Sequence, residues 1–147
     1  MFASEEHTMT LEEIQEHSIF PVGGENTAFA GYFQGTSYLQ MLSLKQVAIG
    51  NVTFEPGCRN NWHIHHAKEG GGQVLLVTAG RGWYQEWGCP ARELRAGDVV
   101  NIPPEVKHWH GAAKDSAFQH LAIEVPGAET WTEWCGPVRD EEYRKLR

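Results

Sequence analysis

The chain has 147 residues, which is enough for one domain with its own hydrophobic core but cramped for two. Its formal net charge at pH 7 is −7, and Lys and Arg cluster only in its last few residues. Nucleic acids and anionic membranes normally demand a concentrated positive surface. We therefore expect no nucleic-acid and no membrane partner.

The three cysteines, Cys58, Cys89 and Cys135, are widely spaced and odd in number. At least one must stay unpaired, which fits a reducing compartment better than a secreted disulfide framework. The first residues contain early carboxylates and no apolar core of signal-peptide length, and no later segment approaches the roughly 20 apolar residues of a membrane span. The sequence therefore predicts a cytoplasmic globular protein.

The first predicted element is a short helix. Thr10 and Glu13 form a capping-box pattern, and Leu11, Ile14 and Ser18 fall on one helical face. The helix is expected to end before Phe20. We assign residues 1–28 to an N-terminal helical extension.

Short β-type runs separated by Gly and Pro follow this helix. They predict an all-β barrel or sandwich over residues 29–126, with hairpin turns at 78–83 and 86–94, because Gly supplies the positive φ of tight turns. A C-terminal extension, 127–147, ends in a charged tail that reads either as a terminal helix or as a frayed end. The predicted strands are 37–44, 47–55, 73–79, 82–88, 98–103, 107–113 and 117–125.

Six of the eight histidines fall between His63 and His120. Residues i and i+2 of a strand point to the same face, so His63 pairs with His65 and His108 pairs with His110. One such pair is a weak signal, since a histidine near a strand end is more often a hydrogen-bonded surface residue. Two pairs that face each other across a barrel would gather imidazoles at one centre. They predict a transition-metal site without naming the metal.

The spacing around the first pair resembles the first motif of the cupins, in which a glycine, five residues and HxH are followed by a glutamate and a glycine. Gly57 and the two histidines match its first half. Counting forward from His65 puts Glu69 at the glutamate position, whereas counting back from Gly80 puts Gln73 there. We favour Gln73 because it opens an apolar strand, where a ligand is held rigidly. Glu69 remains the alternative, because a carboxylate is the better ligand for a hard ion.

The second cupin motif is matched by Gly97, Pro103 and His108. Glu105 stands where the family has glycine, and Ala112 stands where it has asparagine. These departures put the turn geometry in doubt rather than metal binding. The resemblance implies an all-β fold, a cupin-type double-stranded β-helix (jelly-roll barrel), here with a short N-terminal helix.

The resemblance narrows to the small single-domain cupins that include bacterial manganese-dependent hydroxynitrile lyases, and to cupins associated with carboxymuconolactone decarboxylases. It implies one divalent transition metal per chain, with Mn or Fe favoured and Zn or Ni as alternatives. It also implies a homodimer or higher homo-oligomer, whose interface Trp131 and Trp134 could cover. The segments that carry it are 52–66, 73–83, 97–113 and 119–125. The ligand set that it implies is His63, His65, Gln73 and His108.

In those lyases the histidine of the matching last segment serves as acid and base, a role that falls on His120 here. A second interpretation makes His120 a neighbour that hydrogen-bonds a ligand. His110 is also expected beside the ligands rather than among them, and His66 in a loop. Residues 70–72 form a lid over the site or a flexible linker.

A metal held by three histidines and one amide keeps open positions, which is the mark of a catalytic site. We expect a metal-dependent enzyme acting on a small organic molecule, with lyase-type chemistry on an α-hydroxy compound such as a cyanohydrin. The alternatives are an Fe-dependent dioxygenase and a non-catalytic small-molecule-binding barrel.

Overall fold

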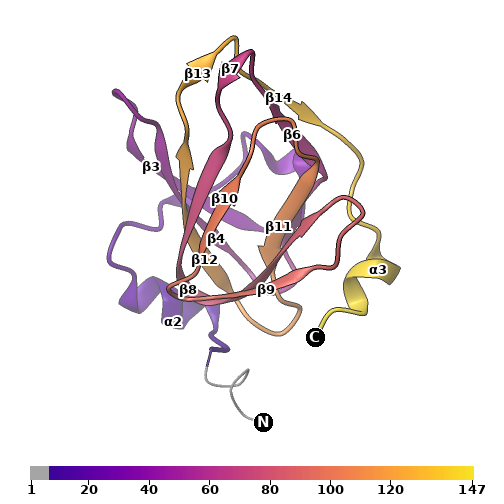
Figure 1. Ribbon diagram of the computed structural model, residues 1–147. Coiled ribbons are helices and arrows are strands. Elements are labelled where there is room, and N and C mark those ends of the chain that lie inside the picture. Colours follow the sequence, from indigo (N-terminus) through magenta and orange to yellow (C-terminus); the bar gives the residue numbers. More distant parts are fainter. Residues whose placement is uncertain (1–6) are drawn as a thin grey trace.

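The computed structural model describes residues 7–147. Its first helix, α2 (Leu11–His17), lies below the sheet in Figure 1 and packs on it through the buried side chain of Ile14. The capping box is confirmed: the Glu13 amide donates to Thr10 Oγ1 at 3.1 Å, and the Thr10 amide donates to Glu13 Oε1 at 2.9 Å. The helix ends at His17, before Phe20 as expected, and Ser18 is its C-cap.

Two antiparallel sheet faces curl into the expected jelly-roll barrel (Figure 1). The strands of one face, in spatial order, are β1 (Gly24–Glu25), β3 (Ser37–Ser43), β4 (Ile49–Phe54), β12 (Phe118–Glu124), the first part of β8 (Gln73–Glu86) and β10 (Val99–Ile102). Those of the other are β9 (Arg92–Arg95), the second part of β8, β11 (His108–Ala112), β5 (Arg59–Asn60) and β2 (Phe33–Gln34), with β6 (His63–His66) between β11 and β14 (Trp131–Trp134).

The long strand β8 corrects one prediction. No hairpin turn interrupts residues 78–83, because β8 runs on through them and passes from one face to the other. Gly80 has φ +75°, and a Cβ there would lie 2.0 Å from the carbonyl oxygen of Ala117. The glycine therefore permits a bend and a close strand approach rather than a reversal of the chain. The turn expected at 86–94 is confirmed, since it joins β8 to β9.

The main core lies between the two faces. It is built from inward side chains that alternate along the strands, as period-2 burial requires. The bulkiest members with little or no exposure are Phe54, Leu75, Leu94, Val100, Ile102 and Phe118.

The C-terminal segment packs on the barrel. Its β14 pairs with β6, and its charged tail forms the helix α3 (Asp140–Arg144), so the terminal-helix alternative holds (Figure 1). Tyr143 anchors this helix: its hydroxyl donates to the carbonyl of Ala112 at 2.6 Å, and the guanidinium of Arg59 lies 4.1 Å from its ring centroid. A 3-10 turn, Ala30–Tyr32, precedes β2.

The glycine-rich insertion is ordered by pairing. β7 (Glu69–Gly70) pairs with β13 (Gly127–Ala128) in a small separate sheet, which forms the tip at the top of Figure 1. All three cysteines are free thiols. Among residues 7–147, no helix is long and apolar enough to cross a membrane.

Candidate metal centre

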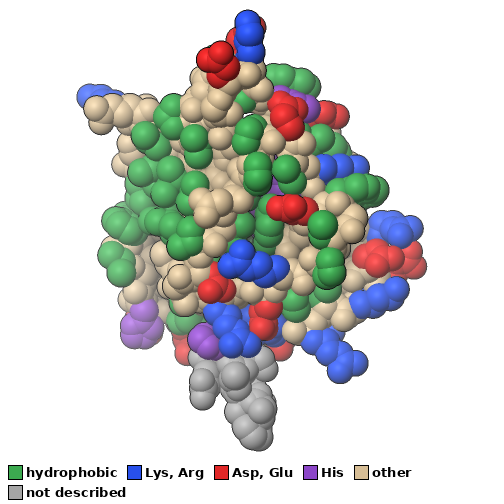
Figure 2. Space-filling view, viewed as in Figure 1, with side chains coloured by type: hydrophobic (Ala, Val, Ile, Leu, Met, Phe, Trp, Pro, Cys, Tyr) green, Lys and Arg blue, Asp and Glu red, His purple; other side chains and the backbone are tan. Residues whose placement is uncertain are grey.

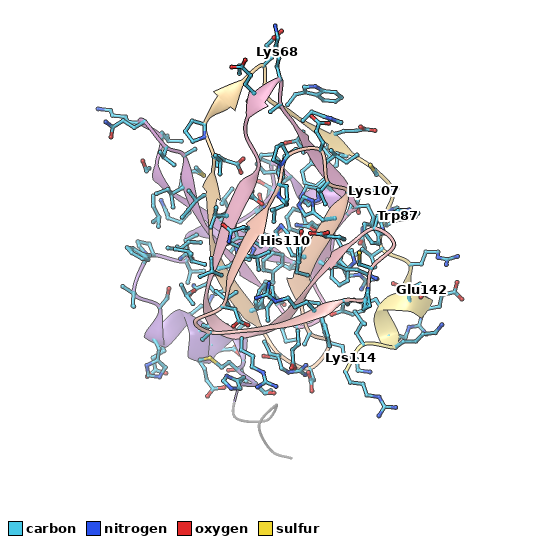
Figure 3. The ribbon with its side chains drawn as sticks, in the orientation of Figure 1. Lys68, Trp87, Lys107, His110, Lys114 and Glu142 are labelled. Carbon is cyan, nitrogen blue, oxygen red and sulfur yellow. The ribbon has the colours of Figure 1, made fainter. Side chains whose placement is uncertain are left out.

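A cavity of about 310 Å³ opens into the barrel and gathers the predicted site residues. One wall is apolar and includes Phe33, Leu39, Val52 and Phe54. Another group of lining side chains is polar, and Figure 3 shows His110 in the middle of the barrel. The polar wall consists of Asn60, His63, His65, Gln73, His110, His120, Glu124 and Thr132.

His63 and His108 face each other directly across β6 and β11, with ring centroids 4.2 Å apart. The Nδ1 of His63 lies 2.8 Å from the carbonyl oxygen of Asn61, and that of His108 lies 2.8 Å from the carbonyl oxygen of Val106. A carbonyl only accepts, so Nδ1 carries the proton in both rings and Nε2 is left with a free lone pair. Each ring is thereby fixed in the tautomer of an Nε2 ligand.

His65 Nε2 and Gln73 Oε1 are also buried without a hydrogen-bond partner, and the Thr132 hydroxyl, which can donate or accept, leaves both tautomers open to His65. His65 Nδ1 lies 3.3 Å from Thr132 Oγ1, and the Gln73 amide donates to Glu124 Oε1 at 2.6 Å. The ring of His65 lies 5.1 Å from that of His63 and 5.2 Å from that of His108.

Three buried polar atoms of this group have no hydrogen-bond partner: His65 Nε2, Gln73 Oε1 and His108 Nε2. Leaving buried polar atoms unpaired costs about 1–3 kcal/mol each, so a protein rarely keeps several of them together. A bound cation would satisfy all three at once. The donor set, imidazole nitrogens with one amide oxygen, suits a divalent transition metal.

His110 also approaches this centre. One ring nitrogen from each of His63, His108 and His110 lies within 4.8 Å of the others, and His65 is not part of this close group among the described residues. The His110 amide donates to Asn60 Oδ1 at 2.9 Å, and His110 Nδ1 lies 3.1 Å from His120 Nε2. His110 thus lies between His63 and His108 on one side and His120 on the other.

Burial keeps these imidazoles neutral. Loss of solvation lowers the pKa of His65 and lowers those of His63 and His110 well below their usual value. The same cause lowers the pKa of His108 and of His120 to about 4. Neutral imidazole is the form that binds a metal or accepts a proton.

The structure separates the two candidates for the fourth ligand. Gln73 is buried and lines the cavity, whereas Glu69 is exposed on β7 opposite Ala128. Gly72 helps to set this geometry, because its φ is +92° and a Cβ there would lie 2.5 Å from the carbonyl oxygen of Ile102.

The departures from the second motif leave the turn before β11 intact. Glu105 adopts φ +70°, the conformation for which glycine is favoured. Its amide donates to the carbonyl of His65 at 2.9 Å, and its carboxylate lies 2.5 Å from His66 Nδ1. Ala112, at the asparagine position, is buried in the core.

His66 lies on β6 rather than in a loop, and its side chain bridges two carboxylates outside the cavity. Hydrogen bonds to Glu133 and Glu105 raise its pKa.

Two site residues come from β14, which the sequence placed outside the site. Thr132 contacts His65, and the Trp134 ring lies 4.7 Å from that of His63 while stacking on Tyr32 at 4.4 Å. The sequence feature that indicates them is the i, i+2 spacing of Thr132 and Trp134, which puts both side chains on one face of a strand.

The Cupin_2 family model, a cupin domain, matches residues 50–124, just over half of the chain. The chain belongs to the cupin family. An (R)-mandelonitrile lyase of Granulicella tundricola is 48% identical to this cupin over 99 residues, which are 67% of this chain and 72% of that protein.

Solved structures agree on the fold. A cupin-like protein from Thermotoga maritima is 41% identical to this cupin, with a TM-score of 0.75 over 87% of this chain and 96% of the other. A Cupin 2 conserved barrel domain protein from Salinispora arenicola has a TM-score of 0.52 at 24% identity, over 62% of this chain and 76% of the other. At that identity the second likeness concerns the fold alone.

Proposed function

We propose that this cupin is a metal-dependent enzyme acting on a small organic molecule, and that it cleaves or forms an α-hydroxynitrile. The observation that carries the proposal is the group of buried, unpartnered ligand atoms beside an apolar cavity. Kinship with a protein named as a mandelonitrile lyase supports the reaction class.

We propose His63, His65, Gln73 and His108 as the ligands of one divalent transition metal, with Mn or Fe favoured. The tautomers of His63 and His108, both set by backbone carbonyls, support this set. When bound, such an ion polarises an oxygen of the substrate as a Lewis acid.

His120 is the proposed proton acceptor. Its ring is fully buried between Phe54 and Phe118, at centroid distances of 5.3 and 5.6 Å, and its Nδ1 has no hydrogen-bond partner. Its pKa of about 4 leaves this imidazole neutral at physiological pH, so one ring nitrogen has a lone pair that can accept a proton. In cleavage, the hydroxyl proton passes to His120, the C–C bond electrons leave with cyanide, and a carbonyl compound remains. In synthesis, His120 returns the proton.

The cavity limits the substrate to a small molecule. Its volume of about 310 Å³ is at the lower end for ligand sites. The apolar wall of Phe33, Leu39, Val52 and Phe54 suits an alkyl or aryl substituent, whereas the hydroxyl group would face the histidines.

The test is elemental analysis of protein purified without added metal or chelator, followed by an assay of mandelonitrile cleavage through the release of benzaldehyde. We expect near-stoichiometric manganese or iron and a turnover that is lost with the metal in His63→Ala/His65→Ala. His66→Ala, which removes a neighbouring imidazole outside the cavity, should keep both. Metal without turnover on any cyanohydrin would exclude the lyase, and no metal after reconstitution would favour a binding barrel.

We also propose a homodimer or higher homo-oligomer. Figure 2 shows apolar side chains gathered at the left of the view, on the side of β3. Exposed apolar residues in the first part of the chain include Ile19, Phe20, Phe29, Met41 and Leu44, and Trp131 is 59% exposed near the C-terminus. Trp134, in contrast, is used within the chain, against Tyr32 and His63.

A further inference from the structure

Gln73 and Glu124 lie directly opposite each other across β8 and β12. Gln73 Nε2 donates to Glu124 Oε1 at 2.6 Å, and both residues line the cavity. Gln73 is only 7% exposed, whereas Glu124 is exposed to solvent. The pair therefore joins the buried polar wall to the mouth of the cavity.

A carboxylate only accepts hydrogen bonds, so it selects the NH₂ end of the Gln73 carboxamide. The oxygen must then point the other way, and Gln73 Oε1 is buried there without a partner. Turning the amide over would bring its oxygen against the carboxylate oxygen. Because hydrogen bonds to a charged group are about twice as strong as neutral ones, Glu124 fixes one of two otherwise similar orientations.

The backbone holds both residues in place. The Glu124 amide donates to the carbonyl of Ala48 at 3.0 Å, and the Val125 amide donates to the carbonyl of Gly72 at 3.1 Å. Gly72, next to Gln73, occupies a tight position that excludes a side chain. Neither strand can shift without breaking these contacts. The orientation of the Gln73 carboxamide therefore depends on its hydrogen bond to the Glu124 side chain.

We propose that Glu124 is a positioning residue that holds the Gln73 carboxamide with Oε1 toward the ligand histidines. This inference rests on the proposed metal site, in which Gln73 is a ligand. It also gives a reason for glutamine at position 73: a glutamate there would place two carboxylates at hydrogen-bonding distance, where they repel each other unless one is protonated.

The test is calorimetric titration of Mn(II) into metal-free protein. Glu124→Leu removes the acceptor, and we expect Mn(II) affinity to fall about 10- to 100-fold, the usual effect of losing a partner of a metal ligand. Glu124→Gln keeps an acceptor oxygen but adds an NH₂ donor that can bond Gln73 Oε1 in the turned-over orientation, so its affinity should also fall, by less than that of Glu124→Leu. Unchanged affinity in Glu124→Leu would overturn the proposal.

A double-mutant cycle gives the second readout. If Glu124 acts only through Gln73, then Glu124→Leu should change Mn(II) affinity less than about twofold in a Gln73→Ala background. The same loss in both backgrounds would overturn the proposal. Circular dichroism and thermal unfolding of each metal-free variant verify the fold, and Glu124→Ala replaces the leucine variant if that variant does not fold.

These measurements distinguish the positioning role of Glu124 from the proposed lyase activity. Wild-type binding of Mn(II) with unchanged affinity in Glu124→Leu overturns the positioning role and leaves the lyase reaction standing. A loss in Glu124→Leu that disappears in the Gln73→Ala background, together with a wild type that turns over no cyanohydrin, supports the positioning role and removes the lyase. A wild type that binds no Mn(II) overturns both.

Discussion

His110 Nδ1 and His120 Nε2 lie 3.1 Å apart, and a single proton lies between them when both rings are neutral. If His120 donates, its Nδ1 is free to accept a proton from substrate, and His110 must carry its own proton on Nε2. If His110 donates, its Nε2 becomes available to a metal, and His120 carries a proton on Nδ1 and is no longer a base. His120 as the base and His110 as an Nε2 ligand therefore exclude each other.

His120→Ala should lower kcat about 10²- to 10⁴-fold, the usual contribution of a general acid or base. The metal content should stay near one ion per chain, because His120 is not a proposed ligand. Steady-state kinetics on a cyanohydrin, together with elemental analysis, measures both. Loss of the metal along with the activity would make His120 a support of the metal site instead.

His65→Ala and His110→Ala distinguish a metal site that includes His65 from one that includes His110. We expect His65→Ala to lose bound metal, because His65 Nε2 is one of the unpartnered atoms, and His110→Ala to retain it. Elemental analysis after reconstitution with Mn(II) is the measurement, with circular dichroism to verify the fold. The reverse pattern would assign the site to His63, His108 and His110. Because His110 and His120 share one proton, that assignment would also exclude His120 as the base.

Gln73→Ala should lose metal, and Glu69→Ala should not. The reason is placement, since Gln73 lines the cavity whereas Glu69 is exposed on β7. Metal content of the two variants, purified in parallel, decides the question. If only Glu69→Ala loses metal, the tip formed by β7 and β13 must fold over the site on binding.

The metal-free protein should lose stability as the pH falls from about 6.5 to about 4. The pKa of His108 and of His120 is about 4 in the folded chain against 6.5 for an ordinary histidine, so between these values the unfolded chain binds more protons. Stability is complete above pH 6.5 and declines toward pH 4, by about 3 kcal/mol for each residue. Burial of His63 and His110 acts in the same direction.

Urea unfolding of metal-free protein at pH 7.5, 6.0 and 4.5 measures this decline. His120→Phe should flatten it, because the variant has one fewer imidazole to protonate. A free energy of unfolding that stays constant over this range would show that the histidines protonate without unfolding the barrel.

The helix, most of the strands and the shared faces of the histidines followed from local pattern. The capping box of Thr10 and Glu13 needs only neighbouring residues, and the i, i+2 pairs need only strand periodicity. Sequence did not reveal that β8 continues through Gly80, because the same glycine permits a turn or a close strand approach, and the choice depends on Ala117, far along the chain. It also left Thr132 outside the site, because only the pairing of β14 with β6 brings it to His65.

The pairing of β14 with β6 sets the smallest fragment that can hold an intact site. The family match ends at Glu124, and a fragment of residues 50–124 would contain each proposed ligand together with His120. It would lack Thr132 and Trp134 on one side and Phe33 and Leu39 on the other, all of which line the cavity. The backbone edge of β6, which carries His63 and His65, would then lie open to water. Residues 50–124 would supply the proposed reactive groups, and the flanking segments enclose the space around them.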